Sequence, residues 1–329
     1  MDIAEKIISK NSSKNIISRD IITLDALRYL KNRVGFHAFN FSSQSFITKM
    51  KIGKYQLYSI ETSEFGLDGG AMFGIIPKVL WEKKLKPDNL NRIPMVTRSL
   101  LLVSDNKKIL IDTGNGPKWT KKLKQMYDID LSKYNISTSL QKYGFSTNEI
   151  TDVICTHLHF DHVGGNTFID NDQLVPTFPN AIYWIGQDNW NLANQPSQKD
   201  QGSFMSHDWD ILRENNMIKI VNDQFLDEIE IIFTQGHTDG LMHPVISDGT
   251  KTIFYGSDIF PTHAHIPVPW VMAYDLRPSE TINEKNELLK NMFNDEWILF
   301  FEHDPFFQAC TIGMEGKHFI MNREVIISG

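Results

Sequence analysis

The chain has 329 residues, of which 41% are hydrophobic and 11% are aromatic, so it can bury a large core, and a disordered chain is excluded. Its 33 basic and 40 acidic residues give a formal net charge of −7, which disfavours nucleic acid and anionic membranes as partners because both would repel the protein. The charge therefore favours a small uncharged substrate.

Residues 1–49 differ in composition from the rest, mixing Ile, Leu, Lys and Asn with Ser, as in K-N-S-S-K-N. Charged residues interrupt the first positions, so the apolar core of a signal peptide is missing, and no later apolar run is long enough to span a bilayer. We therefore expect a cytoplasmic protein that does not enter membranes. The N-terminal extension is predicted to be either a helical arm or a weakly ordered tail, and an arm that packs on a partner chain is compatible with a homodimer.

From residue 50 onward, short runs typical of β-strands alternate with helical patterns. Strands are predicted at 55–60, 97–104, 108–112, 151–156, 181–186, 228–234, 244–247, 251–255 and 297–301. Helices are predicted at 117–127, 208–215 and 278–293, the last with Ser279 as its N-cap. The only cysteines, Cys155 and Cys310, indicate no disulfide framework. Mixed strands and helices without a linker predict one layered α/β domain over residues 50–329.

Three histidines and an aspartate follow the predicted strand at 151–156 within six positions. The segment I-C-T-H-L-H-F-D-H-V-G-G contains His157, His159, Asp161 and His162. Imidazole and carboxylate groups suit Zn²⁺ and related ions, and a loop leaving a strand can direct alternate side chains toward two points. We expect His157 and His159 to bind one ion and Asp161 and His162 another. A histidine-rich surface turn without metal is the competing interpretation.

Three later segments repeat the pattern of a strand followed by a metal-binding residue. F-T-Q-G-H-T-D-G places His237 after one predicted strand, F-Y-G-S-D places Asp258 after another, and F-F-E-H-D-P places His303 after a third. Seven such side chains are enough for two metal ions. A carboxylate can bridge two cations about 3.5–4 Å apart with its two oxygens, and Asp258 is the expected bridge.

In order and spacing over residues 50–310, these motifs resemble the ligands of the metallo-β-lactamase superfamily: H-x-H-x-D-H at 157–162, G-H-T at 236–238, then Asp258 and His303. The resemblance implies a four-layer αββα sandwich, an α/β fold with its ligands on loops along one edge of two sheets. It makes residues 50–329 the catalytic domain. It also assigns His157, His159 and His237 to one ion, and Asp161, His162 and His303 to the other.

Two further carboxylates are expected behind the ligands. L-I-D-T-G-N-G contains the D-T-G turn of the family, which implies that Asp112 hydrogen-bonds a metal-binding imidazole and so fixes its orientation. G-H-T-D-G departs from many relatives, which carry proline where this chain has Asp239, and Asp239 is predicted to support the ligands in the same way.

The full ligand set, together with D-G-G-A-M-F-G-I-I-P at 68–77 and A-H-I-P-V-P-W-V-M-A-Y-D at 264–275, resembles the branch of dinuclear lactonases and organophosphate hydrolases. This implies two divalent cations per chain, with Zn²⁺ as the default and Mn²⁺, Fe²⁺ or Co²⁺ also compatible. A bridging hydroxide would form because coordination lowers the pKa of water from ~15.7 toward ~7. It would open a lactone or cleave an ester, with Asp161 or Asp258 relaying a proton to the leaving group.

The predicted substrate is a small neutral ester or lactone. By resemblance, N-acyl-homoserine lactones are the leading case, which would make the protein a quorum-quenching lactonase. A phosphotriesterase or aryl esterase similar to methyl parathion hydrolase is the alternative on the same metal centre, because pocket shape decides between them. A non-catalytic metal-binding module is the alternative of another class. Redox relatives of the flavodiiron type are less favoured because this chain has His159 where they carry a carboxylate.

Candidate residues for the substrate pocket flank the ligands in the sequence and are mostly aromatic or apolar. They are Met72, Phe73, Phe160, His263, His265, Trp270 and Phe306. Ordinary packing in the core or on the surface is the competing interpretation for each of them.

Overall fold

The computed structural model describes residues 49–221, 225–226 and 229–327, so the predicted N-terminal extension lies almost entirely outside the described residues. Within these ranges, no helix has both the length and the apolar composition needed to cross a bilayer. Because residues 1–48 are not described, the domain division near residue 50 stays a prediction.

A seven-stranded sheet contains the first part of the domain, in the order β1-β2-β3-β4-β5-β8-β9. Its strands are β1 (Lys51–Ile52), β2 (Tyr55–Asp68), β3 (Arg92–Val103), β4 (Lys108–Ile111), β5 (Asp152–Cys155), β8 (Ile182–Ile185) and β9 (Ile218–Ile220). Strands β1 to β4 pair antiparallel, whereas β4, β5, β8 and β9 pair parallel. The central strand β5, with the sequence D-V-I-C, is buried along its whole length, as expected for a parallel strand covered on both faces.

A six-stranded sheet contains the second part, in the order β10-β11-β12-β13-β14-β15. Its strands are β10 (Ile229–Thr234), β11 (Leu241–Ser247), β12 (Thr252–Tyr255), β13 (Ile298–Phe300), β14 (Ala309–Glu315) and β15 (His318–Val325). Only the β12–β13 pair is parallel, and helix α10 (Pro278–Asn294) lies between these two strands in the sequence. A short hairpin of β6 (Thr167–Asp170) and β7 (Gln173–Pro176) stands apart from both sheets.

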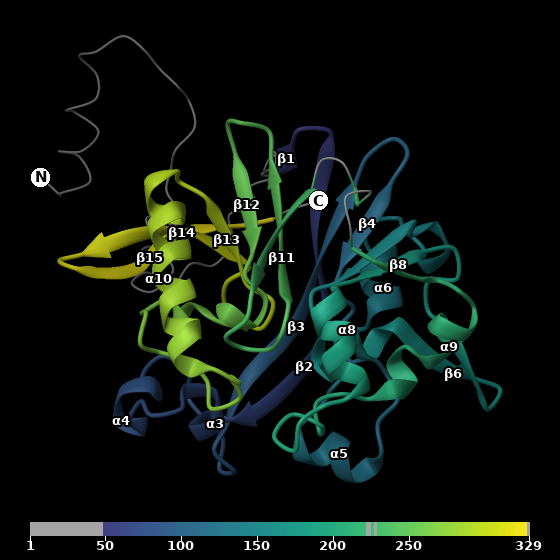
Figure 1. The fold of residues 1–329 in the computed structure, drawn as a ribbon, viewed down its shortest axis with the longest axis horizontal. Helices are drawn as coiled ribbons and strands as arrows, with labels where there is room; N and C mark the ends of the chain where they lie inside the picture. The colour runs from purple at the N-terminus through teal and green to yellow at the C-terminus, as the bar shows by residue number, and fades with distance from the viewer. Residues whose placement is uncertain (1–48, 222–224, 227–228, 328–329) are drawn as a thin grey trace, which may run out of the picture. The chain divides into compact units, whose positions relative to one another are not determined.

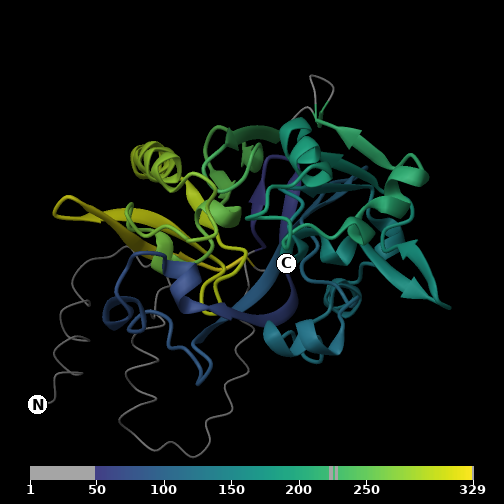
Figure 2. The same ribbon diagram turned by 60° about the horizontal axis from the view of Figure 1, so that its bottom comes forward.

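The two sheets pack against each other, and helices cover their outer faces. One buried cluster joins side chains of both sheets, for example Leu100, Ile154 and Ile253. A second cluster packs helix residues such as Leu212 on the outside of the first sheet, and a third packs Leu289 of α10 on the outside of the second. Figures 1 and 2 show these two halves, with β4, β8, α8 and α9 in one and β13, β14, β15 and α10 in the other. The predicted αββα sandwich is confirmed.

The remaining helices are short. They are α3 (Gly69–Phe73), α4 (Lys78–Trp81), α5 (Lys121–Met126), α6 (Ile136–Gln141), α7 (Phe160–Val163), α8 (Gln187–Asn194) and α9 (Asp210–Glu214). Each predicted strand and helix overlaps an observed one. The predicted start at residue 278 is confirmed, but the predicted N-cap at Ser279 is wrong, because Ser279 lies inside the first turn of α10 and Arg277 is the N-cap. Proline fits the first helical position since its missing N–H has no partner there.

Five strands of the two sheets end at the same edge of the sandwich, and each is followed by a polar turn. Strands β4 and β5 end before Asp112 and Thr156, and β10, β12 and β13 lead into His237, Asp258 and His303. These turns can approach each other closely because they are rich in glycine. A side chain at Gly116, where φ is +60°, would put its Cβ 2.0 Å from the carbonyl oxygen of Gly164. The backbone at position 116 therefore leaves room only for glycine.

Candidate metal centre

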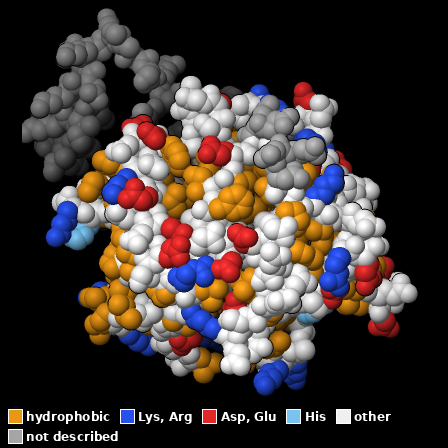
Figure 3. Space-filling view, in the orientation of Figure 1, with side chains coloured by type: hydrophobic (Ala, Val, Ile, Leu, Met, Phe, Trp, Pro, Cys, Tyr) orange, Lys and Arg blue, Asp and Glu red, His pale blue; other side chains and the backbone are white. Residues whose placement is uncertain are grey.

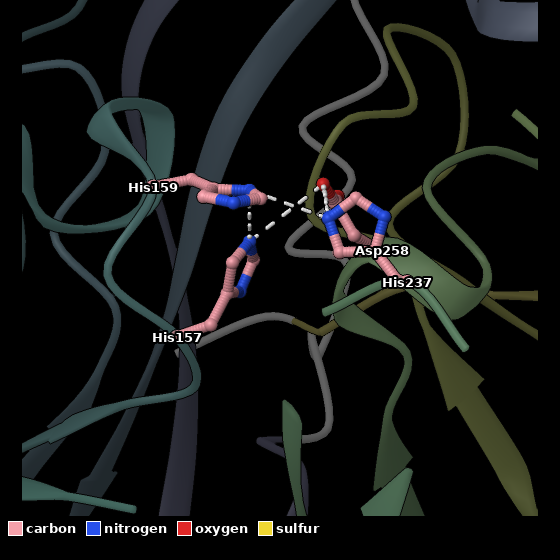
Figure 4. Close-up of side chains that lie close together, drawn as sticks. All are labelled: His157, His159, His237 and Asp258. Carbon is pink, nitrogen blue, oxygen red and sulfur yellow. Dashed lines mark hydrogen bonds and ion pairs between the residues drawn. The ribbon is translucent and has the colours of Figure 1, made fainter. Parts of the chain in front are cut away.

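Three imidazoles and one carboxylate converge to form the first cluster. His157 and His159 come from the loop after β5, His237 from the loop after β10, and Asp258 from the turn after β12 (Figure 4). His157 Nε2 lies 3.0 Å from His159 Nδ1, which lies 3.3 Å from His237 Nε2. All four side chains are buried, and their ligand atoms lie within 4.8 Å of one another.

The second cluster consists of Asp161, His162, Asp258 and His303, again buried and with ligand atoms within 4.8 Å of one another. His162 Nε2 lies 3.2 Å from His303 Nε2. Asp161 Oδ1 lies 3.9 Å from His162 Nε2, and Asp161 Oδ2 lies 3.8 Å from His303 Nε2. This cluster contains the three residues that the resemblance assigns to one ion.

Asp258 belongs to both clusters and directs a different oxygen to each. Its Oδ2 lies 3.2 Å from His237 Nε2 and 3.8 Å from His157 Nε2. Its Oδ1 lies 3.1 Å from His303 Nε2 and 3.4 Å from His162 Nε2. This is the arrangement required of a carboxylate that bridges two cations.

The donor set fits divalent cations. Ligand atoms at ~2.0–2.1 Å around a tetrahedral ion are separated from one another by about 3.3 Å, and the nitrogen–nitrogen distances within both clusters match this spacing. His159 directs its Nδ1 at the cluster, because this atom is the one that lies near Nε2 of His157 and of His237. Its Nε2 is buried and makes no hydrogen bond in the described part of the chain. We propose that the seven side chains hold two ions, as the sequence predicts.

Other groups hold the outward nitrogens of the imidazoles. Nδ1 of His162 lies 3.1 Å from Asp112 Oδ2, as predicted, and Asp112 also accepts hydrogen bonds from the N–H and the hydroxyl of Thr156. Nδ1 of His237 lies 2.9 Å from Asp275 Oδ1, and Nδ1 of His303 lies 3.0 Å from the carbonyl oxygen of Val96. With each Nδ1 engaged in this way, Nε2 is left as the ligand atom.

Burial and neighbouring charges decide the protonation of the site. Burial holds the pKa of His157 and of His159 well below the ordinary value, so both imidazoles are neutral and able to bind metal. Burial alone would raise the pKa of Asp258, but the positive charges of protonated His162 and His237 outweigh it and hold the pKa of this carboxyl well below its ordinary value, and bound cations would supply positive charge in their place. Asp258 is therefore ionised and can act as an anionic bridge.

Glu302 is a further buried carboxyl group behind the second cluster, with Oε2 2.9 Å from His162 Nδ1. Burial, together with the charge of Asp112, raises the pKa of Glu302 to about 8. Glu302 is not among the predicted site residues, although it directly precedes His303.

Asp239 does not take the supporting role predicted for it. It lies in the turn after His237, partly exposed, and one of its oxygens pairs with the guanidinium group of Arg277. Asp275 is instead the carboxylate that orients His237. The physical reason is that Asp239 pairs with a partly exposed Arg277, which also pairs with Glu280. Figure 3 shows acidic and basic side chains lying side by side in this way on the surface.

Replacing Asp275 by asparagine is expected to lower the affinity of the first cluster for zinc by about 10–100-fold, because an orienting carboxylate behind a ligand histidine contributes on that scale. Competition for zinc against a chromogenic chelator measures this. Asp295→Asn makes the same change at an exposed position just after α10 and should leave affinity unchanged. Equal affinities in the two variants would contradict the role of Asp275.

A pocket of about 370 Å³ opens onto both clusters. Its walls are mainly apolar and include three methionines: Leu67, Met72, Met95, Phe160, Met272 and Leu276. Its polar groups, apart from the metal-binding residues, include Tyr127, Tyr274, Lys199 and Asp200. Burial, with the added charge of Asp161, raises the pKa of Tyr127, so this phenol is protonated at neutral pH and can donate a hydrogen bond.

Of the seven predicted pocket residues, the structure places Met72 and Phe160 in this wall. Phe73 and His265 are instead buried core residues that stack on each other, with ring centroids 4.7 Å apart. Trp270 packs edge-on against Phe73. The prediction that Phe73, His265 and Trp270 line the pocket is wrong, because their rings pack against one another.

The other two predicted pocket residues also lie elsewhere. His263 pairs with Asp304 at 2.5 Å, and Phe306 is 60% exposed and lines a separate groove. The missed residues Tyr127, Lys199 and Tyr274 reach the pocket from segments that carry no metal ligand. Of these, only Tyr274 lies in a stretch that the family resemblance singles out.

The αββα sandwich and its two buried clusters of histidine and aspartate place the protein in the class of metal-dependent hydrolases. The family model described as the metallo-beta-lactamase superfamily matches residues 92–303. The chain therefore belongs to the metallo-β-lactamase superfamily.

Several solved structures are similar to this chain. A probable metal-dependent hydrolase from Staphylococcus aureus is 27% identical, with a TM-score of 0.75 over 84% of this chain and 100% of that one. AidC, a dizinc quorum-quenching lactonase in complex with a product, is 22% identical, with a TM-score of 0.69 over 84% and 97%. An N-acyl homoserine lactone hydrolase with N-hexanoyl-L-homoserine at its catalytic metal centre is 20% identical, with a TM-score of 0.58 over 78% and 95%. At these identities the two lactonases show a shared fold.

Proposed function

We propose that the protein hydrolyses neutral esters and lactones with two divalent cations bound in the metal centre, and that N-acyl-homoserine lactones are its leading substrates. The observation that carries the proposal is the pocket of about 370 Å³, whose apolar wall borders both clusters. Such a wall suits an acyl chain, because flexible methionine side chains adapt to apolar groups of different shape. Similar folds in lactonases also support it.

Two bound cations would supply a water molecule that is ionised near neutral pH and would polarise the scissile carbonyl group. The chain's own residues do the rest. The apolar wall holds the part of the substrate that does not react, and the neutral phenol of Tyr127 donates a hydrogen bond to a substrate oxygen. Asp161, whose side chain is about nine-tenths buried beside this wall, accepts and returns a proton at its carboxylate.

A substrate panel tests this function. Zinc-loaded protein is offered N-acyl-homoserine lactones of increasing acyl length, a simple γ-lactone, an aryl acetate, a thioester and a dialkyl aryl phosphate. We expect turnover of lactones and esters, with KM falling up to about fourfold for each added methylene until the apolar wall is filled, because burying one CH₂ contributes ~0.8 kcal/mol.

Fast turnover of the phosphotriester without turnover of any lactone or ester would favour the organophosphate hydrolase alternative. Binding of two metal ions without turnover of any compound would favour a metal-binding module. Either outcome would overturn the proposed function.

A further inference from the structure

Lys285 is a lysine without any exposed surface, in the middle of helix α10. Its ammonium group donates hydrogen bonds to the carbonyl oxygens of Trp270, at 2.7 Å, and Pro267, at 3.1 Å. It also lies 5.6 Å from the centre of the Phe260 ring. Among the described residues no carboxylate lies within ion-pair distance of it, so these backbone carbonyls are its principal partners.

The two carbonyls belong to one turn, because the N–H of Trp270 itself donates to the carbonyl of Pro267 at 2.9 Å. Much of this turn is at the surface, and Pro269 is exposed. Its aromatic residue Trp270 meets the core through the edge contact with Phe73. Lys285 is therefore the group that ties the backbone of the turn to the second sheet's covering helix.

The residues after this turn form one wall of the pocket. Met272, Tyr274 and Leu276 line the pocket, and Asp275 between them orients His237. This stretch is tied at its far end, where the N–H of Leu276 donates to the carbonyl of His237 at 3.0 Å. The stretch is also held in its middle, where the N–H of Ala273 donates to the carbonyl of Ala71 at 2.8 Å, so the Lys285 turn fixes the end of the wall that precedes Met272.

Keeping a lysine at this position is costly. Burial lowers the pKa of Lys285 to about 7, with Asp275 as the neighbouring charge that opposes the effect. A methionine of similar length would avoid that cost, but it would leave the carbonyl oxygen of Trp270 without its lysine donor and that of Pro267 with the N–H of Trp270 alone. The lysine is thus explained by the turn that it holds.

We propose that Lys285 is a positioning residue for the substrate pocket, fixing the turn at 267–270 and with it the wall formed by Met272, Tyr274 and Leu276. The inference rests on the proposed function in one respect: it assigns Lys285 a part in binding the long apolar portion of an ester or lactone. Short substrates, which make little contact with this wall, do not depend on it.

The test compares Lys285→Met with Lys290→Met, which makes the same change on the exposed side of the same helix. Amide hydrogen exchange of peptides covering 266–276 in the zinc-loaded proteins gives a readout independent of activity. We expect exchange in this segment to accelerate about tenfold or more in Lys285→Met. We also expect KM for a long-chain lactone to rise about tenfold, while kcat for a short ester and the zinc content stay within twofold. Lys290→Met should match the wild type.

Unchanged exchange and an unchanged ratio of long-chain to short-chain KM in folded Lys285→Met would overturn the inference. So would acceleration spread evenly over the chain, because that would mean a general loss of stability. If Lys285→Met does not purify folded, Lys285→Leu, which also removes the N–H donor, is read by the same two criteria. If the wild type hydrolyses no ester or lactone, the proposed function fails, and the exchange data still decide the role of Lys285.

Discussion

Replacing Asp258 by alanine is expected to remove bound metal and turnover together, with kcat/KM falling by at least about 10³-fold, the scale on which loss of a central catalytic group acts. Asp258 is the residue shared by the two clusters, with one oxygen directed at each. Its removal takes one ligand from each cluster, so both ions would be bound more weakly at once. Elemental analysis of the purified protein and steady-state kinetics measure the two effects.

The control for this variant is Asp239→Ala, which removes a carboxylate only two residues from a predicted ligand. Asp239 pairs with Arg277 at the surface and contacts neither cluster. The Asp239→Ala variant should therefore retain both metal ions and near wild-type turnover. Full activity in metal-free Asp258→Ala would contradict the dinuclear assignment, and circular dichroism of both variants checks that the fold is intact.

Removing the metal from the wild-type protein is expected to abolish turnover and to lower the melting temperature by about 5–10 °C. Ions that bind the folded state alone stabilise it by RT ln(1 + [L]/Kd), which is ~2.7 kcal/mol at one hundred times Kd. For a domain of this size each kcal/mol corresponds to about 2–4 °C. The buried clusters also bring five imidazoles and two carboxylates together with little exposure to solvent, which is unfavourable in the absence of cations.

Thermal unfolding with and without a chelator, followed by addition of zinc, manganese or cobalt, measures this change. Recovery of both stability and activity on adding one of these ions also identifies which metal the site prefers. Calcium is the control, because it favours oxygen ligands and should restore neither property. A melting temperature that is insensitive to chelation, in protein shown to be metal-free, would count against metal binding at this site.

The metal centre could be predicted from the sequence because its ligands lie in four segments, each of which follows a strand. His157, His237, Asp258 and His303 occupy turns at strand ends, and the pattern of apolar residues locates those ends. The second sheet places three of these turns beside the one from the first. Local sequence thus contains most of the information about the ligands.

The pocket could not be predicted in the same way, because it is formed by segments distant in sequence. Closeness in sequence to a ligand selected Phe73 and His265, whose rings stack in the core. Tyr127 and Lys199 belong to segments without ligands, and only the packing of the chain brings them to the metal centre. Likewise, nothing local distinguishes Asp275 from Asp239, although only the former faces an imidazole.

Strand boundaries show a similar limit. The strand predicted at 55–60 extends in the structure to Asp68, through the polar residues of E-T-S-E. A bulge between Glu61 and Ser63 shifts the register there, and the buried hydroxyls of Thr62 and Ser63 both meet the hydroxyl of Thr97. Alternating hydrophobicity predicts a strand only where register is regular and burial is apolar.

The ligands of the metal centre come from both sheets, and this has a consequence for assembly during synthesis. The segment after β5, which includes α7, provides four of the seven side chains, but His237, Asp258 and His303 emerge from the ribosome later, with His303 last. A nascent chain can therefore fold its first sheet and still lack a complete cradle for either ion. Metal uptake is then a late event in maturation, and a chain truncated before residue 303 would be a folding intermediate without a finished catalytic centre.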